Sequence, residues 1–221
     1  MILSLISNIV TCLCAFIGFI YGMIKFFRPK KAVYAQMITL AAGCMAFGRL
    51  YQVVRLLTIG DIVERFQLGV LGVIGSLIFL FSANYGVMDS LADDGTKKFK
   101  KYRIIPLIAP LAAAVIYVVF FVLPDRPKLV RIVAGIITAV IMGASYFNLK
   151  HLIFPDVDFG VINCLKEYNI IALIFEFLCI AEMIAYSAES EIAQLVVSIL
   201  MGVSLLLIVP TVERGIQKWS T

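Results

Sequence analysis

The chain has 221 residues, of which 62% are hydrophobic and only 15% are charged, and its mean hydropathy is +1.02. Soluble domains are nearer half apolar and a quarter charged. A soluble fold of this length would need polar surface that the chain does not have, so the composition excludes one and predicts a multi-pass membrane protein. The net charge of +5 is typical of lysine and arginine gathered in cytoplasmic loops.

Seven apolar blocks follow one another, each near the length of about 20 residues that a helix needs to cross a bilayer. They cover residues 2–26, 33–58, 67–88, 104–123, 129–149, 169–187 and 192–211. The sequence therefore predicts an all-α integral membrane protein with one domain, residues 1–221, built as a seven-transmembrane-helix bundle. No basic residue precedes the first block, which indicates a retained helix rather than a signal peptide.

The basic residues divide unevenly between the two sides of this bundle. Thirteen fall in the connections and the tail on one side: Lys25, Arg28, Lys30, Lys31, Lys97, Lys98, Lys100, Lys101, Arg103, Lys150, Lys166, Arg214 and Lys218. Four fall on the other side: Arg65, Arg126, Lys128 and Arg131. The positive-inside rule then places the N-terminus outside the cell and the C-terminus in the cytoplasm. We expect the protein to lie in the plasma membrane. Anionic lipid headgroups are expected beside the basic cytoplasmic loops.

The sequence offers no recognisable catalytic or metal-binding pattern. The five cysteines and the single histidine do not have metal-ligand spacing, and four of the cysteines lie in apolar blocks. The motifs HExxH and GxSxG are absent. We therefore expect no enzymatic activity, no cofactor, no metal and no nucleic-acid partner.

Glycine and proline mark two of the blocks. Gly69, Gly72 and Gly75 form a smooth strip on the third block, which favours close helix packing, with a gating hinge as the alternative. Pro106 and Pro110 predict a kink where the fourth block enters the membrane.

Arg49, Gln52 and Arg55 share one face of the second block. A charge at membrane depth is costly and usually has a partner. At a rise of 1.5 Å per residue, Arg49 lies about 24 Å from the inner end of its helix and Glu182, in the sixth block, about 20 Å from the inner end of its own. We predict an Arg49–Glu182 ion pair with Gln52 and Tyr186 nearby, and place Arg55 at the outer interface.

Two interpretations of these charges remain open. The ion pair can simply hold two helices together. Alternatively, Arg49, Gln52, Arg55, Glu182 and Tyr186 bind a small polar or anionic ligand in an outward-facing pocket, because arginine suits a carboxylate or phosphate. Glu176 is the candidate proton-exchanging carboxylate, since no basic residue is predicted at its level.

The cytoplasmic ends of the third and fifth blocks also carry polar residues. Asn84, Tyr85, Asp89, Ser145, Asn148 and Lys150 are expected to be helix caps and interface anchors, or else a polar latch that responds to helix movement. The connection that starts at His151 is expected to lie along the interface or fold back under the bundle.

The layout favours a receptor-like seven-helix membrane sensor. It resembles the seven-helix membrane modules found ahead of bacterial signalling domains, and since few residues follow the last block, we expect a separate cytoplasmic partner to relay the signal. The alternative is a small proton-coupled transporter or lipid-handling protein, in which Glu176 carries the proton. A purely structural membrane partner is a third interpretation.

Overall fold

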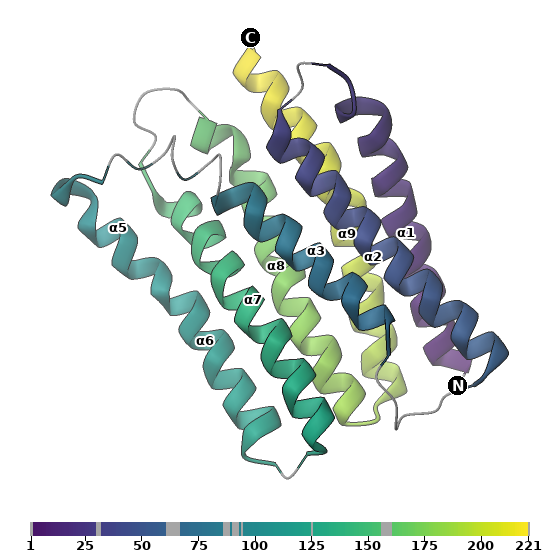
Figure 1. The fold of residues 1–221 in the computed structure, drawn as a ribbon. Coiled ribbons are helices and arrows are strands. Elements are labelled where there is room, and N and C mark those ends of the chain that lie inside the picture. The colour runs from purple at the N-terminus through teal and green to yellow at the C-terminus, as the bar shows by residue number, and fades with distance from the viewer. Residues whose placement is uncertain are drawn as a thin grey trace.

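A computed structural model describes residues 2–29, 32–60, 67–85, 89, 93, 95–124, 126–155 and 161–220 of the chain. All regular elements within these residues are helices. They run in alternating directions through one bundle, with the N- and C-terminal ends at opposite ends of it (Figure 1). Six helices of the described part are long and apolar enough to cross a membrane, and a seventh apolar helix is shorter.

The helices differ in how regular they are. Between the third helix and α7, residues 97–122 form one helical segment in which short 3-10 and π turns interrupt the α-helix. The elements are α1 (Ile2–Phe26), α2 (Val33–Thr58), α3 (Gly69–Ala83), η2 (Lys97–Phe99), α5 (Lys100–Ile104), η3 (Ile105–Leu107), α6 (Ile108–Tyr117), η4 (Val118–Val122), α7 (Lys128–Ile153), α8 (Val161–Ser187) and α9 (Glu191–Ser220).

Four of the predicted helix ends were wrong, all at the end of the bundle that holds the C-terminus. The fourth helical segment begins at Lys97 rather than 104, and α7 continues to Ile153. Helix α8 begins at Val161, and α9 passes through Pro210 to Ser220. Hydropathy detects only the apolar part of a helix, which lipid surrounds. These helices continue beyond that part through polar residues, which hydropathy does not detect. Residues 86–88 of the third predicted block, the connection 156–160, Lys30, Lys31 and Arg65 lie outside the described residues.

The proline-rich entry of the fourth segment departs from a regular α-helix. Ile105–Leu107 form a 3-10 turn that contains Pro106, because proline has no N–H to donate to the preceding turn. Pro110 follows in the first turn of α6 and is buried. The predicted irregularity is therefore present, and it separates α5 from α6.

Six helices form a closed ring, in which each packs on the next in the order α1, α2, α3, α7, α8, α9 and back to α1. Helix α6 packs outside this ring against α7 (Figure 1). The buried core includes Met45 of α2, Leu77 of α3, Phe175 of α8 and Met201 of α9. The ring matters for function, because polar side chains from non-adjacent helices meet at its centre.

The glycine strip of α3 lies against α2, as the packing prediction requires. A Cβ built on Gly72 would lie 2.5 Å from the Cα of Gly48 and 2.6 Å from the carbonyl oxygen of Cys44. No side chain larger than the hydrogen atom of glycine therefore fits at Gly72, and the backbones of α2 and α3 approach closely there. This contact holds α2 and α3 together directly below Arg49.

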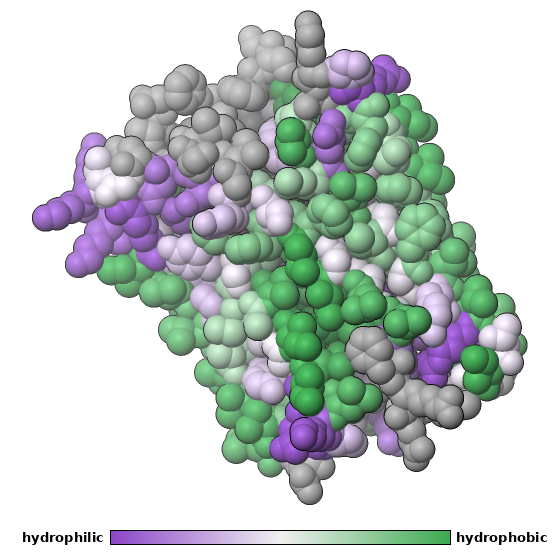
Figure 2. All heavy atoms as spheres, in the orientation of Figure 1, coloured by the Kyte–Doolittle hydropathy of each residue, from purple (hydrophilic) through white to green (hydrophobic). Residues whose placement is uncertain are grey.

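The outer surface has the polarity of a membrane protein. Large apolar side chains such as Ile108, Leu111 and Val115 of α6 are exposed along it. Figure 2 shows a hydrophobic belt between hydrophilic ends, with the largest hydrophilic area around the start of α5. The described basic residues of α5, the end of α7 and the end of α9 all lie at the end that holds the C-terminus (Figure 1). The charge asymmetry predicted from the sequence therefore corresponds to the two ends of the bundle.

Candidate functional site

Arg49 and Glu182 form an ion pair between α2 and α8, which confirms the pairing predicted from depth. Their side chains are only 10% and 17% exposed. The second terminal nitrogen of the guanidinium, Nη1, donates a hydrogen bond to Oδ1 of Asn8 on α1 at 3.2 Å. Since α2 and α8 are not neighbours in the ring, the pair crosses its centre and joins three helices.

A second polar chain lies beside this pair. Nε2 of Gln52 donates to Oε1 of Gln67 at 2.8 Å, and Nε2 of Gln67 donates to the hydroxyl of Tyr186 at 3.3 Å. Gln67 lies just before α3, so the chain connects α2 to α8 through the entry of α3. Gln52 and Tyr186 are thus close to the ion pair, as predicted.

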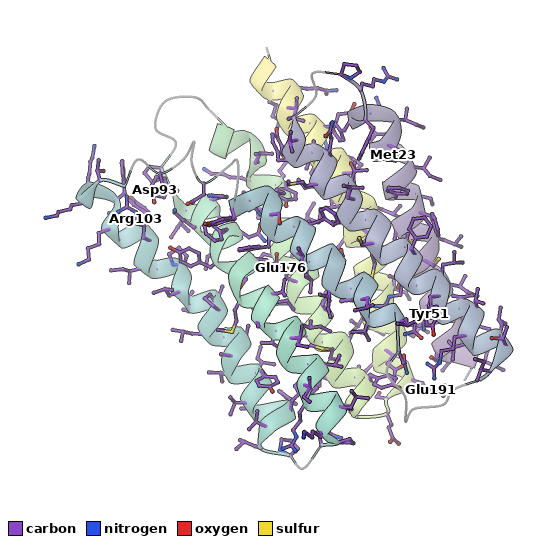
Figure 3. All side chains as sticks on the ribbon, viewed as in Figure 1. Met23, Tyr51, Asp93, Arg103, Glu176 and Glu191 are labelled. Atoms are coloured by element: carbon purple, nitrogen blue, oxygen red, sulfur yellow. The ribbon has the colours of Figure 1, made fainter. Side chains whose placement is uncertain are left out.

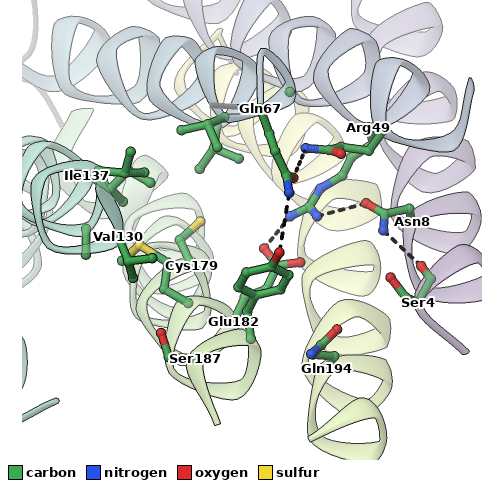
Figure 4. A pocket seen from close by; sticks show the side chains of 18 of the residues that line it. Ser4, Asn8, Arg49, Gln67, Val130, Ile137, Cys179, Glu182, Ser187 and Gln194 are labelled. Atoms are coloured by element: carbon green, nitrogen blue, oxygen red, sulfur yellow. Dashed lines mark hydrogen bonds and ion pairs between the residues drawn. The ribbon is translucent and has the colours of Figure 1, made fainter. Parts of the chain in front are cut away.

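These side chains line a cavity of about 200 Å³ near the end of the bundle that holds the N-terminus. All five residues predicted to bind a ligand lie on its wall: Arg49, Gln52, Arg55, Glu182 and Tyr186. Figure 4 shows Arg49, Asn8 and Gln67 on one side of it, and Val130 and Ile137 on the other. We call it the N-terminal cavity.

Arg55 lies in the last turn of α2, the level predicted for it, but its side chain is not exposed there. It is only 9% exposed and lines the N-terminal cavity. The depth argument gives the level of its Cα and not the burial of its side chain. The cavity therefore has two guanidinium groups, from Arg49 and Arg55, and one carboxylate, from Glu182.

The guanidinium of Arg49 keeps one donor unused. Its Nε is buried and has no hydrogen-bond partner among the described residues. A buried N–H without a partner is costly, and more so on a charged group.

Glu176 lies deeper in the bundle (Figure 3). It belongs to a hydrogen-bonded chain with buried amide side chains. Its Oε1 accepts a hydrogen bond from Nδ2 of Asn148 at 2.5 Å, and Asn148 in turn accepts one from Asn84. The hydroxyl of Tyr168 also accepts from Asn84, at 3.5 Å. All four side chains are at most 1% exposed, and Oε2 of Glu176 has no partner among the described residues. Asn84 takes the C-cap position of α3, as expected, but both asparagines are buried in the core rather than placed at the membrane interface.

A cluster of charges closes the opposite end of the ring, which we call the Lys150 cluster: Asp89, Asp93, Arg103, Lys150 and His151. Nζ of Lys150 lies 2.5 Å from Oδ1 of Asp89 and 2.8 Å from Oδ2 of Asp93. Asp93 also pairs with Arg103, which is labelled beside it at the start of α5 in Figure 3. Lys150 and His151 are 3% and 2% exposed. Both belong to the last turn of α7, so Lys150 lies at the helix end as predicted, whereas His151 is part of the helix rather than the start of the connection.

The two carboxylates of the Lys150 cluster are held in their charged form. Hydrogen bonds from Arg103 hold the pKa of Asp93 well below its usual range, although partial burial opposes them, and Lys150 adds to the lowering. Burial alone would raise the pKa of Asp89, but hydrogen bonds from His151 and Lys150 outweigh it and lower that pKa. A carboxyl whose pKa is lowered by folding stabilises the fold above its unfolded pKa, and that contribution is lost as the pH falls toward the folded pKa. The Lys150 cluster therefore stabilises the protein at neutral pH and weakens in acid.

Among the cavity residues that sequence reasoning missed are Asn8 and Gln67, whose side chains hydrogen-bond to Arg49 and to Gln52. Asn8 is the only amide side chain of α1, so the depth comparison that paired Arg49 with Glu182 could also have included it. Gln67 precedes α3 in a connection, where no helical periodicity predicts the direction of a side chain. Cys179, which also lines the cavity, was placed correctly on the face of its helix between Glu176 and Glu182.

The chain matches none of the protein-family models, characterised proteins or solved structures with which it was compared. Its class therefore follows from the fold and the surface alone. The protein is a multi-pass helical membrane protein whose apolar helices contact the lipid bilayer. Within that class, its particular features are the N-terminal cavity and the buried charges of the ring.

Proposed function

We propose that the protein is a receptor-like membrane sensor that binds a small anionic ligand in the N-terminal cavity. The observation that carries this proposal is a pair of buried arginines, Arg49 and Arg55, on the wall of one cavity near the end of the bundle. Glu182 lies on the same cavity wall. A carboxylate or phosphate is the kind of group that the planar fork of a guanidinium binds best.

The size of the cavity limits the ligand. At about 200 Å³ it is smaller than the pockets of roughly 300–1,000 Å³ that hold drug-sized molecules. The ligand in this proposal is accordingly a small metabolite rather than a peptide or a whole lipid. No catalytic role is proposed, and the protein binds its ligand unchanged.

The charge asymmetry of the bundle supports an outward-facing cavity. Basic residues gather at the end that holds the C-terminus, and the positive-inside rule assigns such an end to the cytoplasm. The N-terminal cavity then faces the outside of a cell whose plasma membrane holds the protein. Exposed Lys97, Lys98, Lys100 and Lys101 would lie beside anionic headgroups of the inner leaflet.

Competition for Arg49 gives the proposed sensor a way to respond. An anion bound to Arg49 competes with Glu182, the contact that joins α2 to α8 across the ring. Loosening that contact changes the free energy that holds α2 against α8, and α8 continues to the basic end of the bundle. A cytoplasmic partner that contacts the basic end would detect the change.

Anion-dependent thermal stability tests this function. We expect acetate, hexanoate, succinate or inorganic phosphate to raise the melting temperature of the purified protein in lipid nanodiscs. A ligand at a hundred times its Kd stabilises the folded state by about 2.7 kcal/mol. Replacing Arg55 with glutamine removes a charged hydrogen-bond donor, and we expect it to weaken binding roughly ten- to a hundredfold.

Arg131→Gln is the matched control, because Arg131 lies on α7 near the same end of the bundle but does not line the cavity. The control variant should bind like the wild type. Equal loss of binding in both variants, or the absence of stabilisation by every anion, would show that the N-terminal cavity is not an anion site.

The buried chain around Glu176 favours a second candidate, a small proton-coupled transporter or lipid-handling protein. A carboxylate that is fully buried, with an amide as its hydrogen-bond partner among the described residues, is a natural place to exchange a proton inside a membrane. Uptake of a bound anion into proteoliposomes, driven by a proton gradient and abolished by Glu176→Gln, would favour transport. Binding without uptake would favour the sensor.

A further inference from the structure

The N-terminal cavity has two chemically different sides. One side is polar and comes from α1, α2, Gln67 and the end of α8, where Asn8, Arg49, Arg55 and Glu182 lie. The other side is apolar and comes mainly from α7, with Val130, Val133 and Ile137. Figure 4 shows this division directly, because the labelled valine and isoleucine face the labelled arginine across the open space.

The apolar side extends beyond α7. Phe121 from η4 and Val70 and Val73 from α3 extend it on either side of α7. A highly charged ligand such as phosphate would leave this surface facing trapped water. An apolar group placed there would instead be removed from water, which is favourable in proportion to its area.

The polar side supplies recognition for one anionic group. The donors are the guanidinium groups of Arg49 and Arg55, which both line the cavity. Glu182 lies next to them and would repel a second negative charge on the same ligand. The polar side therefore suits a single carboxylate better than a dicarboxylate.

We infer that the ligand of the N-terminal cavity is a short-chain monocarboxylate, whose carboxylate binds Arg49 and Arg55 and whose aliphatic tail packs on α7. This inference rests on the proposed function and narrows it from any small anion to an amphipathic one. The cavity volume limits the tail to a few carbons. Each methylene of the tail that packs against the apolar side lowers Kd roughly fourfold, until the cavity is full.

A chain-length series tests the inference. Binding of acetate, butyrate, hexanoate and octanoate is measured by thermal shift in nanodiscs, beside the alcohols of equal chain length. The alcohols control for partition into lipid, because they share the tail and lack the carboxylate. We expect the affinity of the carboxylates to rise with length and then fall, and the alcohols to bind at least tenfold more weakly.

Ile137→Ala tests where the tail lies, and Ile141→Ala is its matched control. Both isoleucines are buried on α7, but only Ile137 lines the cavity. Ile137→Ala enlarges the apolar side, so the preferred chain becomes longer by one or two methylenes, a change of roughly four- to sixteenfold in the ratio of affinities. Ile141→Ala should lower the melting temperature without changing that ratio.

The outcomes separate this inference from the function on which it rests. If phosphate or succinate stabilises the protein and the monocarboxylates do so no better than acetate, the anion site is real and the inference is wrong. If no anion of either kind stabilises it, both fail. An unchanged preference in Ile137→Ala would also overturn the inference, because the tail would then lie elsewhere.

Discussion

Replacing Arg49 with methionine is expected to lower the free energy of unfolding by about 3–5 kcal/mol. The substitution leaves Glu182 in a largely buried position without its cation, and an uncompensated charge is strongly unfavourable there. Glu182→Met should be similarly destabilising, because Arg49 would keep only its hydrogen bond to Asn8. Unfolding in mixed micelles, followed by circular dichroism, measures both.

The double variant Arg49→Met/Glu182→Met is the informative one. Removing both charges eliminates the desolvation penalty together with the attraction, so the double variant should recover most of the stability lost in each single variant. Losses that simply add would show that the two charges do not interact. Arg131→Met serves as the control and should change the stability little.

The same double variant separates the two interpretations of the ion pair. Because it folds, its affinity for anions can be measured directly. If the pair only holds α2 against α8, binding is retained. If Arg49 recognises the ligand, as proposed here, binding is lost while the fold is kept.

Replacing Lys150 with methionine has the second largest expected effect. The side chain is 4% exposed and lies within 3 Å of the carboxylates of both Asp89 and Asp93. Its removal leaves two negative charges close together, with Arg103 and His151 as the remaining partners of the cluster. We expect a loss of about 3 kcal/mol, near the lower limit for breaking a buried pair, since Arg103 still compensates Asp93.

Lys128→Met is the matched control for Lys150→Met. Lys128 lies at the other end of the same helix and is exposed, so its replacement should change the stability by at most about 0.5 kcal/mol. Unfolding of both variants in the same micelles gives the comparison. Equal, small effects would mean that the Lys150 cluster does not hold that end of the ring together.

The existence of the helices was predictable, whereas several of their ends were not. Each helix that crosses the lipid needs a long apolar stretch, and such stretches can be recognised directly in the sequence. Beyond the lipid, the helices from Lys97 and Val161 and the end of α9 are polar and resemble connections. Only packing against other helices distinguishes such a segment from a loop.

The Arg49–Glu182 pair was predictable because depth along a helix follows from a fixed rise per residue. The same argument gave the level of Arg55, in the last turn of α2, but not the burial of its side chain. It also overlooked the amide partners of Glu176, because only charged residues were compared by depth. Asn148 lies at the level of Glu176 and could have been found in the same way.

Sequence reasoning placed Asp89 and Lys150 at the same end of the bundle, as caps, anchors or a polar latch, but it did not predict the ion pairs of the Lys150 cluster. Asp89 and Asp93 follow α3 outside any periodic segment, and Lys150 resembles an ordinary basic residue at a cytoplasmic helix end. Three segments distant in the chain have to meet before their charges become partners. The sign of the charges predicted that this end of the bundle is basic, but not which residues form ion pairs there.

The central claim, an outward-facing cavity that binds an anion, is tested most directly by thiol labelling in intact cells. Val130→Cys places a cysteine on the wall of the N-terminal cavity, and Thr96→Cys places one in an exposed position at the other end of the bundle. The unsubstituted chain gives the background from its own cysteines. We expect a membrane-impermeant maleimide to label Val130→Cys in intact cells, more slowly when hexanoate is present, and to label Thr96→Cys only after permeabilisation. Labelling of Thr96→Cys alone in intact cells would contradict the orientation, and labelling of Val130→Cys that hexanoate does not slow would contradict binding in the cavity.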